Sequence, residues 1–230
     1  MTAGPRLTVI VPDYNEDRTI ERVVRAVAAV ALDHEILVVD DASTDATAEI
    51  LARLEREGLV RVFRQDRNRG KGAAVRRGIA EARGEICVIQ DADLEYQPRD
   101  FPELIRPIVE LGADAVYGSR FMGPHRVFLY WHYAANRMLT WFTNLLYDTM
   151  LTDMETGYKA VRTSILRDMR LRSDTFDIEP EITAKLFKRG CKVFEVPITY
   201  NGRTYAEGKK IRAKDAILAV AALLRFRFTD

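Results

Sequence analysis

The chain is 230 residues long, which fits one domain with a single hydrophobic core. Hydrophobic residues make up 47% and charged residues 30%, a balance that excludes disordered, collagenous and disulfide-scaffold proteins. The 35 basic side chains nearly match the 34 acidic ones, so a general nucleic-acid binder is not indicated. Cys87 and Cys191 lie too far apart for a metal or redox motif, and we expect both to be small core residues in a reducing compartment.

The first half of the chain alternates strand and helix patterns. Strands are predicted at 7–11, 35–39, 59–63, 85–90 and 115–118. Helical spacing of apolar residues, with glycine or proline at the boundaries, predicts helices within 20–27, 45–58, 71–83 and 98–111. Strands that are apolar on both faces and alternate with helices indicate a parallel sheet. We therefore predict an α/β fold with a doubly wound, mostly parallel sheet flanked by helices.

The second half is expected to form a helix at 176–189, a strand at 192–200 and a terminal amphipathic helix after a basic loop at 201–212. Its most unusual segment, 126–150, is aromatic and amphipathic. Seven aromatic residues fall there, namely Phe128, Tyr130, Trp131, Tyr133, Trp141, Phe142 and Tyr147. No linker or repeat divides the chain, so residues 1–230 are predicted to form one domain.

Polar residues follow four of the predicted strands, as Asn15-Glu16, Asp40-Asp41, Asp91 to Asp93 and Ser119-Arg120. In parallel α/β sheets, ligands bind beyond the carboxyl ends of the strands. The sequence therefore predicts a single ligand crevice at this edge of the sheet.

Asp91 and Asp93 follow an apolar strand and are separated by one alanine. Two carboxylates so placed can reach one hard cation, and Mg²⁺ or Mn²⁺ prefers oxygen ligands completed by water and substrate phosphates. The alternative is a solvated turn with a local side-chain hydrogen bond. Because other acidic strand ends are expected nearby, we favour a metal–diphosphate site.

Two further strand ends suggest binding roles. Asp45 is predicted to cap the helix that follows it, whereas Asp41 is expected to accept hydrogen bonds from a base or ribose. A glycine–lysine–glycine run around Lys71 opens another helix without matching a phosphate-loop spacing. Lys71 and the helix N-terminus either hold an anion or form a tight turn that brings the helix and sheet together.

The motifs together resemble those of a known family. The first five, in order, are Pro12-x-Tyr14-Asn15-Glu16, Val39-x-Asp41-Ala-Ser-Thr-Asp45, Asn68-x-Gly70-Lys71-Gly72, Asp91-Ala-Asp93-Leu-Glu95-Tyr and Gly118-Ser119-Arg120. Three later ones are Leu151-Thr-Asp153-Met-Glu155-Thr-Gly157-Tyr-Lys159, Phe176-Asp-Ile-Glu179-Pro-Glu181 and Glu195-Val-Pro-Ile-x-Tyr200-x-x-Arg203. The chain thus resembles the family 2 glycosyltransferases of the GT-A fold, and more narrowly the dolichyl- and polyprenyl-phosphate hexosyltransferases. Each motif is weak alone, but the ordered set is specific and covers nearly the whole chain.

The resemblance implies a role for each matching residue. The nucleotide base and ribose would be held by Pro12, Tyr14, Asn15, Glu16, Val39 and Asp41. The divalent metal, Mg or Mn, and the diphosphate would be carried by Asp91, Ala92 and Asp93. Phosphate groups of donor or acceptor would meet Arg120, Arg203 and Lys209. Glu95 stands where mannose synthases usually have glutamine, and its carboxylate is a third candidate metal ligand.

The implied reaction is an inverting transfer of a hexose from a GDP- or UDP-sugar, with a metal neutralising the leaving diphosphate. A polyprenyl phosphate acceptor is already largely ionised near neutral pH (second pKa about 6) and needs little deprotonation. A hydroxyl acceptor on a sugar or glycolipid would need a general base, which Asp153 or Glu155 could supply. Both residues have the alternative role of shaping their loop, and the donor nucleotide and the hexose stay open.

The division of the chain follows from the same resemblance, with residues 1–120 expected to bind the nucleotide sugar and 121–230 the acceptor and the membrane interface. Polar residues interrupt the first 20 positions and apolar runs are short, so neither a signal peptide nor a transmembrane helix is expected. The aromatic segment is either an ordinary core helix or a membrane-interface helix. The resemblance favours a cytoplasmic protein attached peripherally to the membrane, where a partner subunit could supply an anchor.

Two other classes fit less well. Sugar-phosphate nucleotidyltransferases usually carry a glycine-rich loop after the first strand, where this chain has Pro-Asp-Tyr-Asn-Glu. A non-catalytic nucleotide-sugar-binding subunit should have lost an acidic strand-end residue, yet Asp41, Asp91 and Asp93 are all present.

Overall fold

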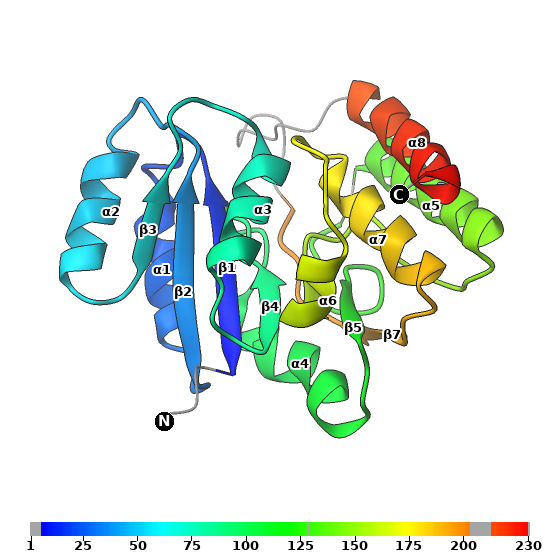
Figure 1. Cartoon of the computed structure of the whole chain (residues 1–230), viewed down its shortest axis with the longest axis horizontal. Helices are drawn as coiled ribbons and strands as arrows, with labels where there is room; N and C mark the ends of the chain where they lie inside the picture. Colours follow the sequence, from blue (N-terminus) through cyan, green and yellow to red (C-terminus); the bar gives the residue numbers. More distant parts are fainter. Residues whose placement is uncertain (1–5, 128, 203–212, 230) are drawn as a thin grey trace.

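The computed structural model describes residues 6–127, 129–202 and 213–229 (Figure 1). Its seven-stranded sheet has the order β3-β2-β1-β4-β6-β5-β7. The strands are β1 (Leu7–Asp13), β2 (His34–Asp40), β3 (Arg61–Arg64), β4 (Ile86–Ile89), β5 (Ala115–Ser119), β6 (Lys159–Arg162) and β7 (Val193–Pro197). Strand β6 runs antiparallel to both of its neighbours, and the other pairs are parallel. The predicted α/β fold with a mostly parallel sheet is confirmed.

Helices connect the strands and cover both faces of the sheet. They are α1 (Ile20–Ala28), α2 (Thr47–Arg56), α3 (Lys71–Glu81), the 3-10 turn η1 (Pro98–Asp100) with α4 (Phe101–Glu110), α5 (Tyr130–Tyr147), α6 (Thr163–Asp168), α7 (Ile178–Lys188) and α8 (Ala213–Phe228). In Figure 1, α3 lies in front of the sheet and α1 behind it, while α5, α7 and α8 lie together on the right, near the C-terminus of the chain.

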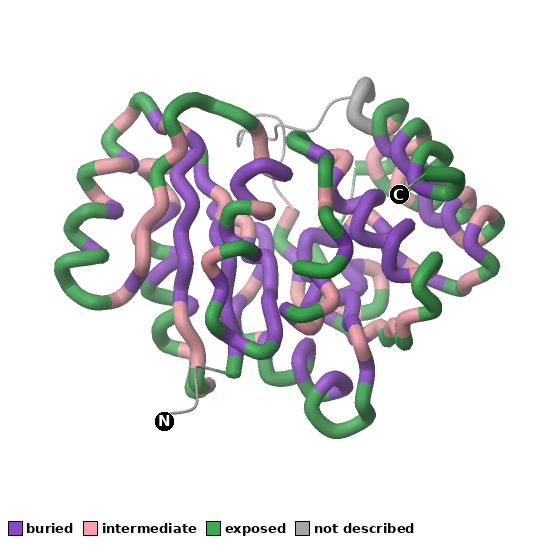
Figure 2. The backbone as a smooth tube through the Cα atoms, viewed as in Figure 1, coloured by how far each residue is buried: buried purple, intermediate pink, exposed green. Residues whose placement is uncertain are grey.

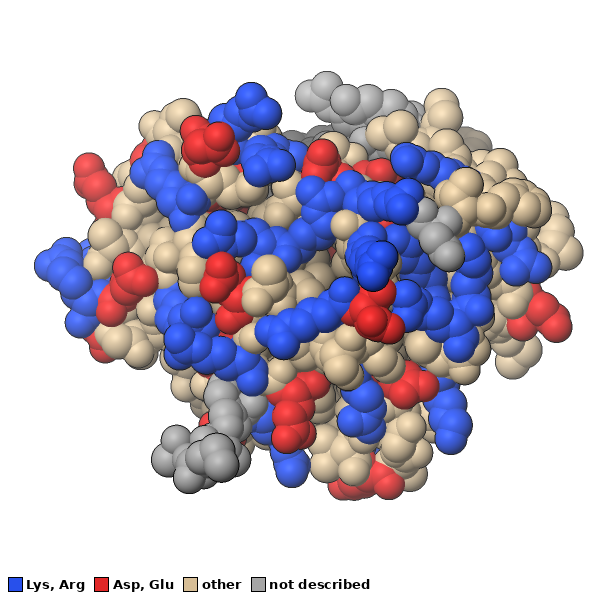
Figure 3. Space-filling view, in the orientation of Figure 1, with Lys and Arg blue, Asp and Glu red and all other residues tan. Residues whose placement is uncertain are grey.

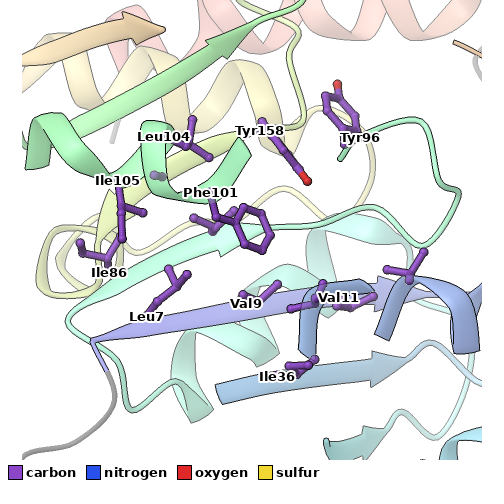
Figure 4. Packing of buried hydrophobic residues seen from close by; sticks show 14 of the residues in the cluster. Leu7, Val9, Val11, Ile36, Ile86, Tyr96, Phe101, Leu104, Ile105 and Tyr158 are labelled. Carbon is purple, nitrogen blue, oxygen red and sulfur yellow. The ribbon is translucent and has the colours of Figure 1, made fainter. Parts of the chain in front are cut away.

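The two faces of the sheet follow from the alternation of side chains along each strand. In β1, Leu7 and Val9 point into a cluster with α1, α2 and α4, where Phe101 and Tyr158 also pack (Figure 4). Ile10 points the opposite way, into a cluster with α3, α5, α6, α7 and α8. The central strands are therefore buried on both sides, as the purple traces of Figure 2 show.

Two elements escaped prediction, and both lie between 159 and 168. Strand β6 has four residues and begins with a lysine, and α6 has only six residues, so neither carries a readable period. The antiparallel direction of β6 has a functional consequence. Its N-terminal end lies at the edge where the parallel strands end, and residues 153–158, which lead into it, are brought to that edge as well. Of the predicted basic loop, 203–212 lies outside the described residues.

The aromatic segment forms α5, and most of its large side chains face outward. Trp131 is 79% exposed and Trp141 is 64% exposed, so the alternative of an ordinary core helix does not hold for these two side chains. Only the inner side of the helix packs on α8, where the Tyr147 hydroxyl donates a 2.7 Å hydrogen bond to the Leu223 carbonyl. We define the α5–α8 apolar surface by its exposed members Tyr130, Trp131, Met138, Trp141, Leu145, Ile217, Leu218, Leu224 and Phe228.

No helix within the described part of the chain is long and apolar enough to cross a membrane. The face shown in Figure 3 is rich in Lys and Arg over α3, α6 and α7. A hollow between the end of α6 and α7 is lined by Arg170, Arg172, Lys185, Lys188 and Arg189 together with Asp168 and Met169. Several of these cations are bound within the chain, since Lys185 donates to the carbonyls of Met169 and Arg170 and Arg189 pairs with Asp168.

Candidate active site

A cleft of about 340 Å³ opens at the carboxyl edge of the sheet, between the ends of β1, β2 and β4, the segment before β6, and α7. We call it the strand-end cleft. Eleven of the residues predicted from the sequence line it: Pro12, Tyr14, Glu16, Asp41, Lys71, Asp91, Ala92, Asp93, Glu95, Arg120 and Glu155. The expectation that four strand ends share one crevice agrees with this arrangement.

The loops around the strand-end cleft contain strained backbone. Asn15, Ala42 and Leu94 have φ values of 55°, 62° and 64°, in the left-handed region that residues other than glycine seldom adopt. Each lies in the loop after a central strand, β1, β2 or β4. Such strain costs on the order of 1–3 kcal/mol per residue and persists only where the surroundings hold it, typically at functional sites. These loops are therefore held in one conformation by their neighbours.

Asp41 is already heavily engaged within the chain. Its Oδ1 accepts hydrogen bonds from the Gln65 amide (2.6 Å) and from the Arg69 N–H (2.8 Å), and its Oδ2 accepts one from the Gly70 N–H (2.7 Å). A carboxylate offers about four acceptor positions. Asp41 lines the strand-end cleft, but most of its acceptor capacity goes to holding the 65–70 loop in place.

The turn before α3 packs tightly against the segment that precedes α7. Gly70 has a φ of 98°, and a Cβ at Gly72 would lie 2.4 Å from the Ser173 carbonyl oxygen. The Ala73 N–H donates to the Asp174 carbonyl (3.2 Å), so this helix N-terminus is partly used by protein. Of the two roles considered for the run around Lys71, the packing turn is the one the backbone shows, while the Lys71 side chain faces the strand-end cleft.

Lys71 joins two carboxylates across the strand-end cleft. Its ammonium lies 2.7 Å from Asp91 Oδ1 and 3.3 Å from Glu179 Oε1, and the other oxygen of Glu179 lies 2.7 Å from the ammonium of Lys159. Burial acts to lower the pKa of Lys71, but the two carboxylates outweigh burial and raise it, so Lys71 stays charged. Asp91, Lys71, Glu179 and Lys159 thus form a row of alternating charges. Because Lys159 is 1% exposed, the row leads from the cleft into the core.

The residues near Asp91 fit a divalent cation whose remaining ligands would come from a diphosphate. Asp91 and Asp93 both line the strand-end cleft, and Asp91 already binds a cation, the ammonium of Lys71. Glu95, the third expected ligand, also lines the strand-end cleft; it is 8% exposed, and its Oε2 accepts a 2.6 Å hydrogen bond from the Tyr200 hydroxyl. Among the described residues no three Asp, Glu, His or Cys side chains converge on one ion position. Two aspartates with phosphate oxygens and water suit Mg²⁺ or Mn²⁺.

Arg120 and Asp153 form a buried, bidentate ion pair beside this site. Arg120 Nε and Nη2 each lie 2.7 Å from one oxygen of Asp153, which is fully buried. Burial acts to lower the pKa of Arg120, but the Asp153 carboxylate outweighs it and raises that pKa, so Arg120 stays charged. Nη2 also donates to Asn136 (3.3 Å), whereas Nη1 has no hydrogen-bond partner within the described chain. Asp153 therefore orients an arginine whose remaining N–H groups can bind an anion.

Glu155 differs from Asp153 in its surroundings. It lines the strand-end cleft, and its Oε1 is buried without a hydrogen-bond partner in the described structure. Burial raises the pKa of its carboxyl to about 7, and the negative charge of Glu179 acts in the same direction against Lys159. A carboxyl with such a pKa is suited to proton transfer near neutral pH. Of the two candidate bases, Glu155 is the one that reaches the cleft.

The remaining predicted residues lie elsewhere. Val39 is buried in β2 and packs with Ala74 of α3. The Asn15 side chain accepts a 2.8 Å hydrogen bond from the Thr44 N–H. Neither residue lines the cleft. Arg203 and Lys209 fall outside the described residues. Sequence reasoning gave no role to Glu179 or Gly157, although both belong to quoted motifs. At Gly157 a Cβ would lie 2.7 Å from Asp91 Oδ2, so only glycine lets the chain pass this close to the carboxylate.

Comparison with solved structures defines the class of the fold. Glucosyl-3-phosphoglycerate synthase from Mycobacterium tuberculosis superposes with a TM-score of 0.75 at 22% identity, covering 99% of this chain and 82% of that one. The fold is therefore GT-A-like. A second crystal structure of that synthase, in complex with Mn²⁺, uridine diphosphate and glucosyl-3-phosphoglycerate, superposes with a TM-score of 0.74 at 23% identity.

Sequence comparison identifies the family. Residues 8–170 match the profile of glycosyl transferase family 2, and this chain belongs to that family of enzymes. A dolichol-phosphate mannosyltransferase of Pyrococcus furiosus is 32% identical over 210 residues, which cover 89% of this chain. An undecaprenyl-phosphate mannosyltransferase of Micrococcus luteus and a dodecaprenyl-phosphate galacturonate synthase of Rhizobium johnstonii are each 29% identical, over 89% and 88% of this chain. The chain spans 59% of the Pyrococcus protein, 87% of the Micrococcus protein and 61% of the Rhizobium protein.

Proposed function

We propose that this glycosyltransferase moves a hexose from a GDP- or UDP-sugar to a polyprenyl phosphate, with inversion at the anomeric carbon. The observation that carries the proposal is the pairing of charges within the strand-end cleft. Asp91 and Asp93 are suited to a metal and diphosphate. The buried Arg120 lines the same cleft, and its N–H groups that no described residue binds would contact a second phosphate. Relatives that act on polyprenyl or dolichol phosphates support this acceptor class.

Donor and acceptor are assigned to the two halves of the chain. The nucleoside would lie along Tyr14, Glu16 and Asp41, in the 1–120 half, and its diphosphate would extend toward Asp91 and Asp93. The acceptor phosphate would meet Arg120 and approach from residues 121–230. Mg²⁺ or Mn²⁺ held by the two aspartates would supply Lewis acidity that neutralises charge on the departing diphosphate. Lys71 remains ionised beside Asp91 and would bind a phosphate oxygen of the same group.

The acceptor requires little help from the enzyme. A phosphomonoester is largely dianionic near neutral pH (second pKa about 6), so attack needs orientation rather than proton removal. Asp153 would contribute by fixing the guanidinium of Arg120 from behind through two 2.7 Å contacts. Orienting two reactants in this way can account for several powers of ten in rate.

Peripheral attachment at the cytoplasmic face of a membrane is part of the proposal. The α5–α8 apolar surface exposes both tryptophans, and Trp and Tyr favour membrane–water interfaces. An aromatic surface of this kind would bring the enzyme to an acceptor whose prenyl chain lies in the bilayer. A partner subunit that supplies an additional anchor is compatible with this surface.

Glu155 supports a second candidate function, transfer to the hydroxyl group of a sugar or glycolipid. Such an acceptor must lose a proton, and Glu155 lines the cleft with a pKa of about 7. In this alternative Glu155 is the general base and Asp153 remains the partner of Arg120.

The decisive experiment is a donor and acceptor screen. GDP-mannose and UDP-glucose are each supplied with Mn²⁺ and with no acceptor, a short polyprenyl phosphate or a glycolipid that offers a hydroxyl group, and release of nucleoside diphosphate is measured. Release that requires the lipid phosphate is the expected result and identifies the donor at the same time. Release with a glycolipid hydroxyl acceptor but not with the lipid phosphate would overturn the proposal in favour of the second candidate.

A further inference from the structure

We propose that Tyr200 positions Arg120 for the acceptor phosphate. The Tyr200 ring supports the guanidinium, and the Tyr200 hydroxyl fastens that ring to the turn that carries Asp93 and Glu95. Tyr200 is thus a positioning residue, which acts on the acceptor through Arg120. This inference rests on the proposed function, because it takes Arg120 as the residue that binds the phosphate of the acceptor.

The carboxylate of Asp153 holds one edge of the Arg120 guanidinium. Nε and Nη2 of Arg120 each lie 2.7 Å from an oxygen of Asp153, and Nη2 also donates to Asn136 (3.3 Å). The guanidinium is planar, and a planar group held along one edge can still tilt about that edge. The direction of the N–H groups that no described residue binds therefore depends on what lies against the faces of the guanidinium.

The ring of Tyr200 lies against Arg120. Cζ of Arg120 is 5.3 Å from the centroid of the Tyr200 ring, within the range of a cation–π contact. The ring of the neighbouring Phe121 is farther away, at 5.8 Å. Tyr200 lines the strand-end cleft although it is only 4% exposed, whereas Phe121 does not line the cleft. Of these two rings, that of Tyr200 therefore meets Arg120 inside the cleft.

Tyr200 can support another side chain because it is itself fixed. Its hydroxyl donates a 2.6 Å hydrogen bond to Oε2 of Glu95, and burial raises the pKa of this hydroxyl, which therefore keeps its proton. The ring packs on Tyr96, with the two ring centroids 5.3 Å apart. A Cβ at Gly202 would lie 2.8 Å from Cε1 of Tyr200, so glycine there lets the backbone pass close to the ring.

Tyr200 also joins the acceptor side of the cleft to the metal side. The N–H of Glu95 donates a 3.1 Å hydrogen bond to Oδ1 of Asp93. Leu94, between these two residues, has a φ of 64°, so the turn is held in a strained conformation. Contacts therefore run from Asp93 through this turn and Tyr200 to Arg120.

The test separates acceptor binding from donor binding. Release of nucleoside diphosphate is measured with Mn²⁺, a short polyprenyl phosphate and whichever of GDP-mannose and UDP-glucose the enzyme uses. Tyr200→Leu removes the ring and the hydroxyl, and it should raise the KM of the acceptor at least about fivefold more than the KM of the donor. The matched control Phe63→Leu removes a ring that Arg61 and Arg77 contact outside the cleft, and should leave both KM values unchanged.

Two further variants show whether Tyr200 acts through Arg120. Tyr200→Phe keeps the ring and releases it from Glu95, so it should raise the acceptor KM less, by about twofold. Arg120→Lys keeps a cation beside Asp153 but offers no planar group for a ring to orient. In the Arg120→Lys background, adding Tyr200→Leu should therefore change the acceptor KM by less than about twofold, because residues that act as a unit are not additive.

The outcomes are distinguishable. A smaller rise in the acceptor KM for Tyr200→Leu overturns the inference, and so does an equal rise in the donor KM or an undiminished effect in the Arg120→Lys background. If Tyr200→Leu fails to fold, Tyr200→Phe decides, and an unchanged acceptor KM for that variant overturns the inference. In each of these cases lipid-dependent release by the unmodified enzyme still supports the proposed function. If the unmodified enzyme shows no lipid-dependent release, the proposed function fails and the inference fails with it.

Discussion

The ion pair between Arg120 and Asp153 offers a direct test of how the acceptor side of the cleft is built. Asp153 is fully buried and Arg120 is 6% exposed, so the aspartate is the counter-ion of a charge with little access to water. Replacing Asp153 with asparagine keeps the shape and removes the charge. Breaking a buried pair by removing one partner typically costs about 3–5 kcal/mol, because the other charge stays behind.

The size of the effect can be measured by thermal unfolding. For a chain of this length, each kcal/mol shifts the midpoint by about 2–4 °C, so Asp153→Asn should lower Tm by about 10 °C. A matched control is Glu103→Gln, which breaks the solvent-exposed pair with Arg106 and should change Tm by no more than about 2 °C. In the double variant Arg120→Met/Asp153→Asn, the uncompensated charge is gone, and part of the loss should be recovered.

The result that refutes this reasoning is a Tm for Asp153→Asn within about 2 °C of the unmodified protein. Arg120 would then be accessible enough to water that it needs no counter-ion. A double variant no more stable than Asp153→Asn alone would also contradict the argument, since the loss would then not come from the buried charge.

Three further changes test the remaining parts of the site. Asp93→Ala should abolish Mn²⁺-dependent release of nucleoside diphosphate while leaving Tm nearly unchanged, and a rate like that of the unmodified enzyme would remove Asp93 from the metal site. The double variant Trp131→Ala/Trp141→Ala should weaken cosedimentation with anionic vesicles without loss of Tm. The control Leu111→Ala removes an exposed apolar side chain outside α5 and α8 and should leave vesicle binding unchanged. Undiminished vesicle binding by the double variant would refute a lipid-facing α5. The pKa of Glu155 is raised to about 7 from an ordinary value of 4.5. Between these two pH values the folded chain keeps a proton that the unfolded chain has lost, so the stability of the fold falls as pH rises from 4.5 to about 7. The Tm of Glu155→Gln relative to the unmodified protein should therefore rise from pH 5 to pH 8, and a constant difference would contradict the raised pKa.

Local pattern was sufficient for most of the fold. The β-branched runs that became β1 and β2 are apolar on both faces, and the repeat Ile20, Val23, Val24, Val27 can bury one stripe only as a helix. Because the carboxyl ends of parallel strands share one edge, the strand-end positions of Asp41, Asp91 and Asp93 already implied a common crevice. These inferences need only the period of the side chains and the direction of the strands.

Tertiary structure decided what sequence pattern could not. The reversed direction of β6 brings Glu155 and Gly157 to the same edge, and no local signal records that reversal. Long-range contacts separated the two candidate bases. Asp153 pairs with Arg120, 33 positions earlier, whereas Oε1 of Glu155 accepts no hydrogen bond from the described residues. The exposure of the two tryptophans of α5 depends on how much of that helix α8 covers, which the sequence of α5 alone does not show. Sequence thus determines the period and the chemistry of each segment, whereas burial and charge pairing arise only when distant segments meet.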